Sequence, residues 1–144
     1  MEAKMKPIKK TPLDILEDIY SLAYWMTGNQ GASVGLVKKT YLYGAPSLDE
    51  NVLLRTFRDC YVEEFGQEVD FRFSEEAGKK NIQITDSLKQ WSADIKFSVL
   101  LSEICGLSQR EISEILDKPL ETIRVWLFWG RKLFVTSYLL KASA

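Results

Sequence analysis

The chain has no histidine among its 144 residues, and this absence bears first on catalysis. Histidine is the commonest general base and the commonest metal ligand, so a chain without it is less expected to be an enzyme. The sequence also lacks a glycine-rich phosphate loop and a GxSxG motif. Its acidic pairs at 63–64 and 75–76 are adjacent in sequence, so their carboxylates point in different directions on a helix. We therefore expect a protein that is not an enzyme and has no cofactor.

The chain is also poor in cysteine and in long apolar runs. Cys60 and Cys105 lie within apolar helical patterns and have no CxxC spacing, which predicts buried thiols without a disulfide or a metal site. No apolar run reaches the length of a membrane-spanning helix, and the N-terminal lysines are not followed by the hydrophobic core of a signal peptide. We expect a cytoplasmic protein that has no contact with a membrane.

The chain also has no excess of charge of either sign, because it has 19 basic and 20 acidic residues and a net charge of −1. The chain as a whole therefore has no broad basic surface for nucleic acid. Its length allows one or two small domains, each with a modest core.

Helical periodicity divides the chain into parts and predicts an all-α fold of two small helical units. Residues 1–12 are expected to be a flexible basic arm, and residues 13–65 a three-helix domain. The period is lost in residues 66–85, which are expected to be a linker, and residues 86–144 form the second helical domain. Within the first domain, Gly28 is expected to end one helix, and Ser47 with Glu50 to cap another.

Residues 106–133 have the pattern of a helix-turn-helix. Ser108 is placed to cap a helix, and Glu111 three positions later completes a capping box. The Asp-Lys-Pro sequence ending at Pro119 predicts the end of that helix, because the residue before a proline is driven out of helical geometry. Helical spacing resumes over residues 120–140, so the longer helix comes second, as a recognition helix does. Periodicity alone is equally compatible with an ordinary antiparallel helix pair.

Residues 95–134 resemble the C-terminal DNA-binding region of bacterial extracytoplasmic-function sigma factors. In that family an apolar helix precedes G-L-S-x-x-E-I-A-x-I-L, a turn and T-V-x-x-R-L-x-R-A-R-K-K-L. The matching residues are Gly106, Leu107, Ser108, Glu111, Ile112, Ile115, Leu116, Thr122, Ile123, Leu127, Arg131, Lys132 and Leu133. Upstream, residues 22–29 and 36–42 resemble the family's L-A-x-x-x-T-G-N and L-V-Q-E-T-F-L segments, and residues 53–59 are a weaker match to its promoter-opening helix.

The resemblance implies a sigma factor that initiates transcription, with core RNA polymerase and promoter DNA as its partners. An anti-sigma factor and self-association are further candidate partnerships. The expected DNA-binding residues are Glu121, Thr122, Arg124, Val125, Arg131, Lys132, Arg55 and Arg58. The expected protein-interaction residues are Leu36, Val37, Lys38, Lys39, Tyr41, Trp126, Phe128 and Trp129.

The chain departs from the family pattern on both expected surfaces. Lys38 and Lys39 stand where the family has polar and acidic groups that meet a basic part of the polymerase, so attraction becomes repulsion. Trp126 and Trp129 stand where the family has arginines that approach DNA, and the indole offers one donor in place of a charged fork. These aromatics either pack within the chain or form an exposed patch with Phe128.

Two alternatives to transcription initiation therefore stay open. The first is a degenerate sigma-like regulator that acts by protein–protein interaction through the aromatic residues of the second helix, without initiating transcription. The second is a stand-alone helix-turn-helix repressor, which needs a dimer and a palindromic site. Salt-sensitive DNA binding separates the first alternative from a sigma factor, and size in solution tests the second.

Overall fold

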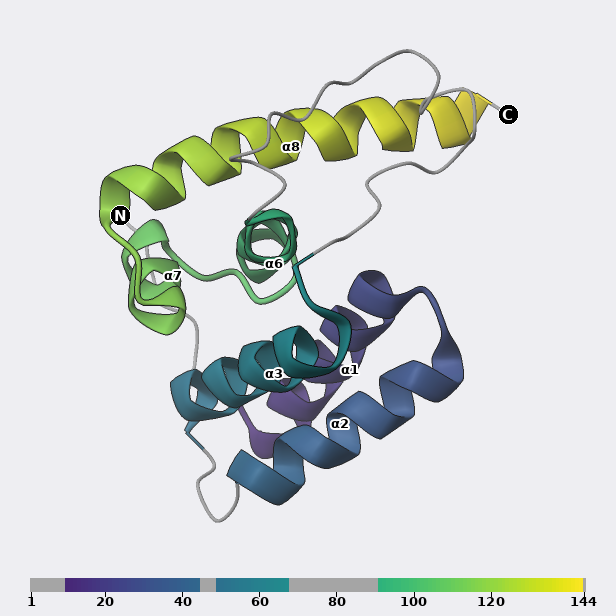
Figure 1. Ribbon diagram of the computed structural model, residues 1–144, viewed down its shortest axis with the longest axis vertical. Helices are drawn as coiled ribbons and strands as arrows, with labels where there is room; N and C mark the ends of the chain where they lie inside the picture. Colours follow the sequence, from purple (N-terminus) through teal and green to yellow (C-terminus); the bar gives the residue numbers. More distant parts are fainter. Residues whose placement is uncertain (1–9, 45–48, 68–90, 144) are drawn as a thin grey trace.

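The computed structural model describes residues 10–44, 49–67 and 91–143, and the side chains among them as far as Lys132. These residues form helices joined by short turns, and none of them lies in a β-strand (Figure 1). The predicted all-α class is therefore confirmed. The N-terminal helices α1, α2 and α3 form one bundle, and the C-terminal helices α6, α7 and α8 form a second group packed on it.

Helix α1 spans Pro12–Thr27 and has a complete signal at each end. Thr11 accepts a hydrogen bond from the backbone of Asp14 and donates its own backbone N–H to the Asp14 carboxylate, which forms a capping box. Gly28 ends the helix in the left-handed conformation with φ 66°, as predicted. The buried face of α1 then follows the helical period.

Helices α2 (Gln30–Gly44) and α3 (Glu50–Phe65) complete the N-terminal bundle. The Asn29 side chain accepts a hydrogen bond from the backbone of Ala32 at the start of α2. The prediction that Ser47 and Glu50 cap α3 is wrong in its N-cap residue: Asp49 accepts from the backbone of Val52 instead, and Ser47 lies outside the described residues. Helix α3 ends at Phe65, the predicted last residue of the domain.

Helix α6 (Ser92–Glu103) is the centre of the molecule and lies between α8 and the N-terminal bundle (Figure 1). Every residue from Ser92 to Leu101 is buried, whichever way its side chain points. A helix buried on all sides has neighbours on all sides, and α6 contacts α1, α3, α7 and α8. Both groups of helices are therefore built against the same central element.

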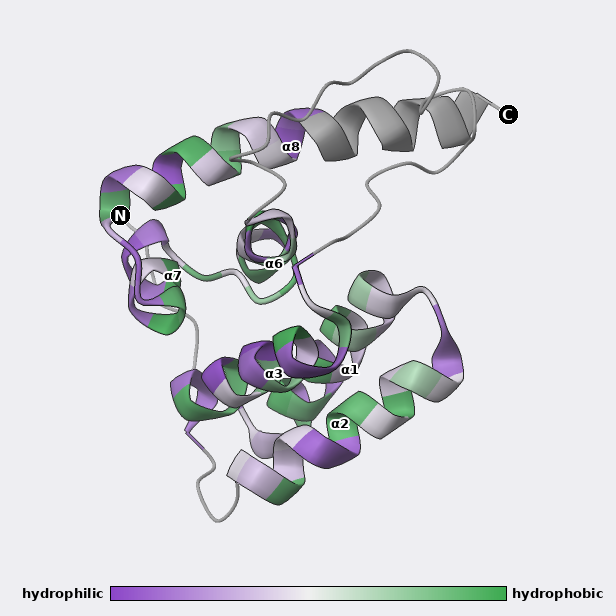
Figure 2. Cartoon of the chain, in the orientation of Figure 1, coloured by the Kyte–Doolittle hydropathy of each residue, from purple (hydrophilic) through white to green (hydrophobic). Residues whose placement is uncertain are grey.

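Helices α7 (Gln109–Leu116) and α8 (Leu120–Ser143) form the predicted short and long pair. The capping box of Ser108 and Glu111 is present, with both of its hydrogen bonds formed. Asp117 ends α7 in the left-handed conformation with φ 55°, directly before the turn that contains Pro119. Apolar and polar residues alternate round α7 and α3, as expected of helices with one buried face (Figure 2).

The two groups of helices share a single hydrophobic core. Phe57 of α3 stacks on Phe97 of α6 with ring centroids 5.5 Å apart. Lys10 adds a polar tie, because its Nζ lies 3.0 Å from Asp18 and 2.5 Å from Glu50 and donates to the carbonyl of Cys105 at 2.7 Å. Burial lowers the pKa of Lys10, but the two carboxylates outweigh it and leave that pKa raised. The N-terminal bundle is thus fixed against the loop that leads into α7.

Candidate nucleic-acid interface

The helix-turn-helix pair is held together by buried apolar residues from both of its helices. Ile112 and Ile115 of α7 are buried, Ile123 and Leu127 of α8 are buried as well, and the two helices are in contact. Because residues on the other side of the first α8 turns do not contribute to this core, they face solvent. This is the geometry in which the second helix of such a pair can enter a groove of DNA.

The exposed side of the first α8 turns presents the expected base-contacting residues. Glu121 and Arg124 are exposed, Val125 is 49% exposed, and Thr122 is half-buried. Arg124 pairs with Glu121 at 3.0 Å and donates to the side chain of Gln109 in α7 at 3.4 Å. The structure therefore brings this part of the predicted site together on one surface, with its cation held loosely by exposed partners.

The two basic residues further along α8 differ in their surroundings. Arg131 donates to the hydroxyl of Ser102 at 2.8 Å and pairs with Glu103 of α6 at 3.4 Å. Lys132 lies over the rings of Phe128 and Trp129, with its Nζ 4.9 and 5.9 Å from their centroids. Both side chains are exposed, so both remain able to reach an anion.

The tryptophans of α8 do not form one patch, which corrects the expected grouping of Trp126 with its neighbours. Trp126 is 5% exposed and packs near Trp91 with ring centroids 6.1 Å apart. Lys118 lies over the Trp91 ring, with its Nζ 4.0 Å from the ring centroid. Phe128 and Trp129 stay 55% and 45% exposed. Trp126 is thus a core residue, because its position faces the segment that leads into α6.

Gly130 sets the approach of α8 to α6, a role that sequence reasoning missed. A Cβ atom at this position would lie 2.5 Å from Cγ2 of Val99 and 3.3 Å from Cγ2 of Ile95. Ordinary contacts begin at 3.4 Å, so only a glycine lets the two helices pack this closely without a shift. The position of α8 relative to α6 therefore depends on glycine at position 130.

Comparison with known families now adds to this geometry. Residues 96–134 match the family model for sigma-70, region 4. The matched segment begins in α6, contains all of α7 and ends within α8. The match supports a sigma-factor-like, DNA-binding transcription protein, and sigma-70 region 4 is a transcription domain rather than an enzyme family. No curated protein and no solved structure matches the chain.

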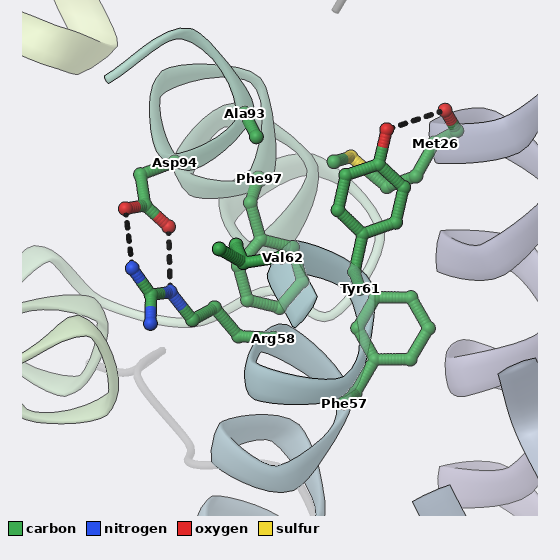
Figure 3. A pocket seen from close by; sticks show the side chains of 8 residues that line it. All are labelled: Met26, Phe57, Arg58, Tyr61, Val62, Ala93, Asp94 and Phe97. Atoms are coloured by element: carbon green, nitrogen blue, oxygen red, sulfur yellow. Dashed lines mark hydrogen bonds and ion pairs between the residues drawn. The ribbon is translucent and has the colours of Figure 1, made fainter. Parts of the chain in front are cut away.

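The region 4-like unit, meaning α6 to α8, contacts the two arginines of α3 that are expected to bind promoter DNA, of which Arg58 is half-buried and Arg55 is exposed. Arg58 makes a two-point ion pair with Asp94 of α6, with Nε and Nη2 each 2.9 Å from one carboxylate oxygen (Figure 3). Arg55 donates to the backbone carbonyl of Glu114 in α7 at 2.6 Å. Hydrogen bonds from Arg58 to Asp94 leave the pKa of Arg58 raised, so its charge is permanent.

Asp94 was not foreseen as a site residue, since nothing in the helical pattern marks an acid whose partner lies 36 residues earlier. The small pocket beside it between α3 and α6 has no room for a water molecule, and it is therefore not a small-molecule site. Its lining residues are Met26, Phe57, Arg58, Tyr61, Val62, Ala93, Asp94 and Phe97 (Figure 3). The ion pair between Arg58 and Asp94 at the edge of this pocket is therefore its main polar feature.

The expected protein-interaction residues of α2 divide into buried and exposed positions. Leu36 is 1% exposed and belongs to the core, while Val37 and Tyr41 are half-buried. Lys38 and Lys39 are exposed, and Lys39 pairs with Glu64 of α3 at 3.2 Å. The charge of Lys39 is therefore partly offset within the chain, which weakens the repulsion expected at this surface.

Two other observations bear on partners and ligands. Among residues 10–44, 49–67 and 91–143, no group of three acidic or cysteine side chains lies close enough to hold a metal ion. No helix in the same described part is both long and apolar enough to cross a membrane.

Cys60 and Cys105 are buried, as predicted.

Proposed function

We propose that this protein is a sigma factor of the extracytoplasmic-function type that binds core RNA polymerase and promoter DNA. The observation that carries the proposal is the region 4 match over a helix-turn-helix whose second helix has exposed first turns. In such a pair the first turns of the second helix are the part that reads base edges in the major groove.

In this proposal, Arg124 is the main direct reader of sequence. Its guanidinium is exposed and is held only by Glu121 and Gln109, both of which are also exposed. Arginine forms a two-point contact with guanine, and each good contact of this kind contributes roughly 1–3 kcal/mol of discrimination. Thr122 and Val125 contribute smaller apolar contacts, such as those made to the methyl group of thymine.

The remaining basic residues of the site contact the sugar-phosphate backbone. Arg131 and Lys132 extend the exposed surface of α8 beyond the groove-reading turns. Arg55 and Arg58 of α3 contact the promoter near the melted region, and the exposed part of α2 that contains Lys38 and Lys39 meets core polymerase. Phosphate contacts fix the position of the protein on DNA, and they make the affinity depend on salt.

The proposal is tested by selecting DNA from a random duplex pool and measuring affinity for the selected sequence at several salt concentrations. Arg124→Ala is expected to lose about 1–3 kcal/mol of preference for the selected sequence over a scrambled duplex. Arg110→Ala, which removes the same charge from the exposed start of α7, is the matched comparison. It is expected to weaken binding to both duplexes by a similar factor and to leave the preference intact. A chain that selects no sequence and shows no salt dependence contradicts the proposal.

A second candidate function is supported by the exposure of Phe128 and Trp129. Large aromatic side chains on a helix surface are typical of protein-binding hot spots. In this alternative the protein no longer initiates transcription and acts by binding another protein through α8. Trp129→Arg separates the two, because it is expected to increase DNA affinity in a sigma factor and to abolish binding of the protein partner in the alternative.

A further inference from the structure

The exposed side of α8 carries an apolar stripe of Val125, Phe128 and Trp129, which are 49%, 55% and 45% exposed. Positions 121, 124, 125 and 128 are three or four residues apart, so they follow one another along a single face of the helix. Phe128 therefore continues the face that begins with Glu121 and Arg124. The family pattern has an arginine at position 129, so the apolar surface here replaces a charged one.

The two aromatic rings of the apolar stripe support each other. Phe128 and Trp129 meet edge to face, with ring centroids 5.5 Å apart and an angle of 84° between the ring planes. The Lys132 ammonium lies over both rings. Contacts of these two kinds stabilise one arrangement of side chains that would otherwise rotate freely in solvent. Phe128 thus presents an ordered apolar surface on the exposed side of α8.

The charges around the apolar stripe fit the major groove of DNA. Residues 121–132 contain three basic side chains and one acidic side chain, which leaves a net charge of +2. Exposed cations lie on both sides of the aromatic pair along the helix, with Arg124 before it and Arg131 and Lys132 after it. In a major groove the base edges lie at the centre and the phosphates at the rims. An apolar centre with cationic flanks matches that layout.

We infer that Phe128 reads the methyl group of a thymine and that Trp129 positions its ring. The inference rests on the proposed function, because it requires α8 to lie in the major groove. Thymine presents an apolar methyl group there, and phenylalanine is among the side chains that contact it. Phe128 lies one turn beyond Arg124, a rise of about 6 Å along the helix, which spans about two base pairs. The preferred sequence therefore has a thymine about two base pairs from the guanine read by Arg124.

The test compares duplexes that differ by one methyl group. Each thymine of the selected sequence is replaced in turn by deoxyuridine, which pairs in the same way and lacks only the methyl group. Affinity of the full chain for each fluorescent duplex is then measured by anisotropy. We expect the replacement about two base pairs from the guanine to weaken binding about fourfold, the size of effect that loss of one buried methyl group gives. The salt dependence is expected to stay the same, because no phosphate contact is lost.

Substitutions of the aromatic side chains assign the methyl contact to a residue. Phe128→Ala is expected to bind the thymine and deoxyuridine duplexes equally and to keep the preference for guanine, which depends on Arg124. Trp129→Ala is expected to reduce the fourfold ratio, whereas Trp129→Phe keeps a ring beside Phe128 and is expected to retain it.

Tyr24→Ala is the matched control. It removes an aromatic side chain of similar exposure, 50%, from α1, which has no proposed DNA contact. The fourfold ratio between the two duplexes is expected to be unchanged in this variant. Because the substituted side chains are all exposed, the variants are expected to fold, which circular dichroism checks.

Two results separate failure of the inference from failure of the proposed function. If no deoxyuridine replacement weakens binding by the natural chain, or if Phe128→Ala keeps the weakening, the inference is overturned and the proposed function stands. A selected sequence without a thymine near that guanine has the same meaning. If the natural chain binds DNA with neither sequence preference nor salt dependence, the inference falls together with the proposed function, and the protein-binding alternative is favoured for the two rings.

Discussion

Gly130→Ala tests whether the close approach of α8 to α6 fixes the position of the second helix. The new Cβ would lie 2.5 Å from Cγ2 of Val99, where ordinary contact begins at 3.4 Å. Val99 is buried and β-branched, so it has little freedom to move away. Overpacking of this kind costs about 1–3 kcal/mol. Alanine regains about 1 kcal/mol of helix propensity, so the net loss is about 0–2 kcal/mol.

Gly35→Ala is the matched control for this experiment. Gly35 lies within α2, is exposed, and has no atom within 4 Å of the position of its Cβ. The same substitution here improves helix propensity without a clash, and it is expected to stabilise the protein by about 0.5–1 kcal/mol. The two variants should therefore differ by about 1–3 kcal/mol, although both change glycine to alanine within a helix.

Thermal unfolding followed by circular dichroism at 222 nm measures the difference. For a chain of this size, 1 kcal/mol corresponds to about 4 °C in Tm, so the gap between the variants is expected to be about 4–12 °C. A Gly130→Ala protein as stable as Gly35→Ala would refute the reasoning, because it would mean that α6 and α8 separate at no cost. DNA affinity of Gly130→Ala, measured on the same sample, reports whether the displaced helix still reads its site.

Three further predictions concern single side chains. Ser108→Ala removes the cap of α7 and is expected to lower the unfolding free energy by about 1 kcal/mol in urea titrations. An unchanged unfolding free energy would show that the Ser108 hydroxyl does not cap the helix. Trp126→Arg places a charge in the core and is expected to cost about 3–5 kcal/mol, whereas Trp129→Arg at a 45% exposed position should change stability by less than about 0.5 kcal/mol; equal losses would contradict the burial of Trp126. Burial raises the pKa of the Cys105 thiol to about 12 from an ordinary value of 9.0, so the unfolded chain loses this proton first and stability falls as the pH rises from 9 towards 12. Urea midpoints should therefore fall more steeply above pH 9 in the natural chain than in Cys105→Ala, and parallel curves would exclude the thiol as the cause.

Local signals in the sequence were sufficient for the helices and most of their ends. The capping box of Ser108 and the left-handed Gly28 depend on residues within one turn, so their chemistry can be read directly. The N-cap of α3 shows the limit of this reasoning. Ser47 and Asp49 are both good N-cap residues two positions apart, and a sequence pattern does not choose between them.

Contacts between distant segments could not be predicted in the same way. The burial of Trp126 depends on Trp91, and the ion pair of Arg58 depends on Asp94, which belongs to the other group of helices. Helix α6 is surrounded by other helices, so even its charged residues are buried. Its sequence therefore has no division into an apolar face and a polar face from which burial could be predicted. The exposed positions in the first turns of α8 follow from the helical pattern, whereas the contacts that join the two groups of helices do not.

In the proposed function, this chain directs transcription by RNA polymerase. Run-off transcription tests it most directly, with purified core polymerase, the full chain and a pool of promoter fragments at physiological salt. We expect that the protein co-purifies with core polymerase, that transcripts begin at defined sites only when it is present, and that Arg124→Ala reduces them. Absence of both polymerase binding and specific transcripts would contradict the proposed function and favour the protein-interaction alternative.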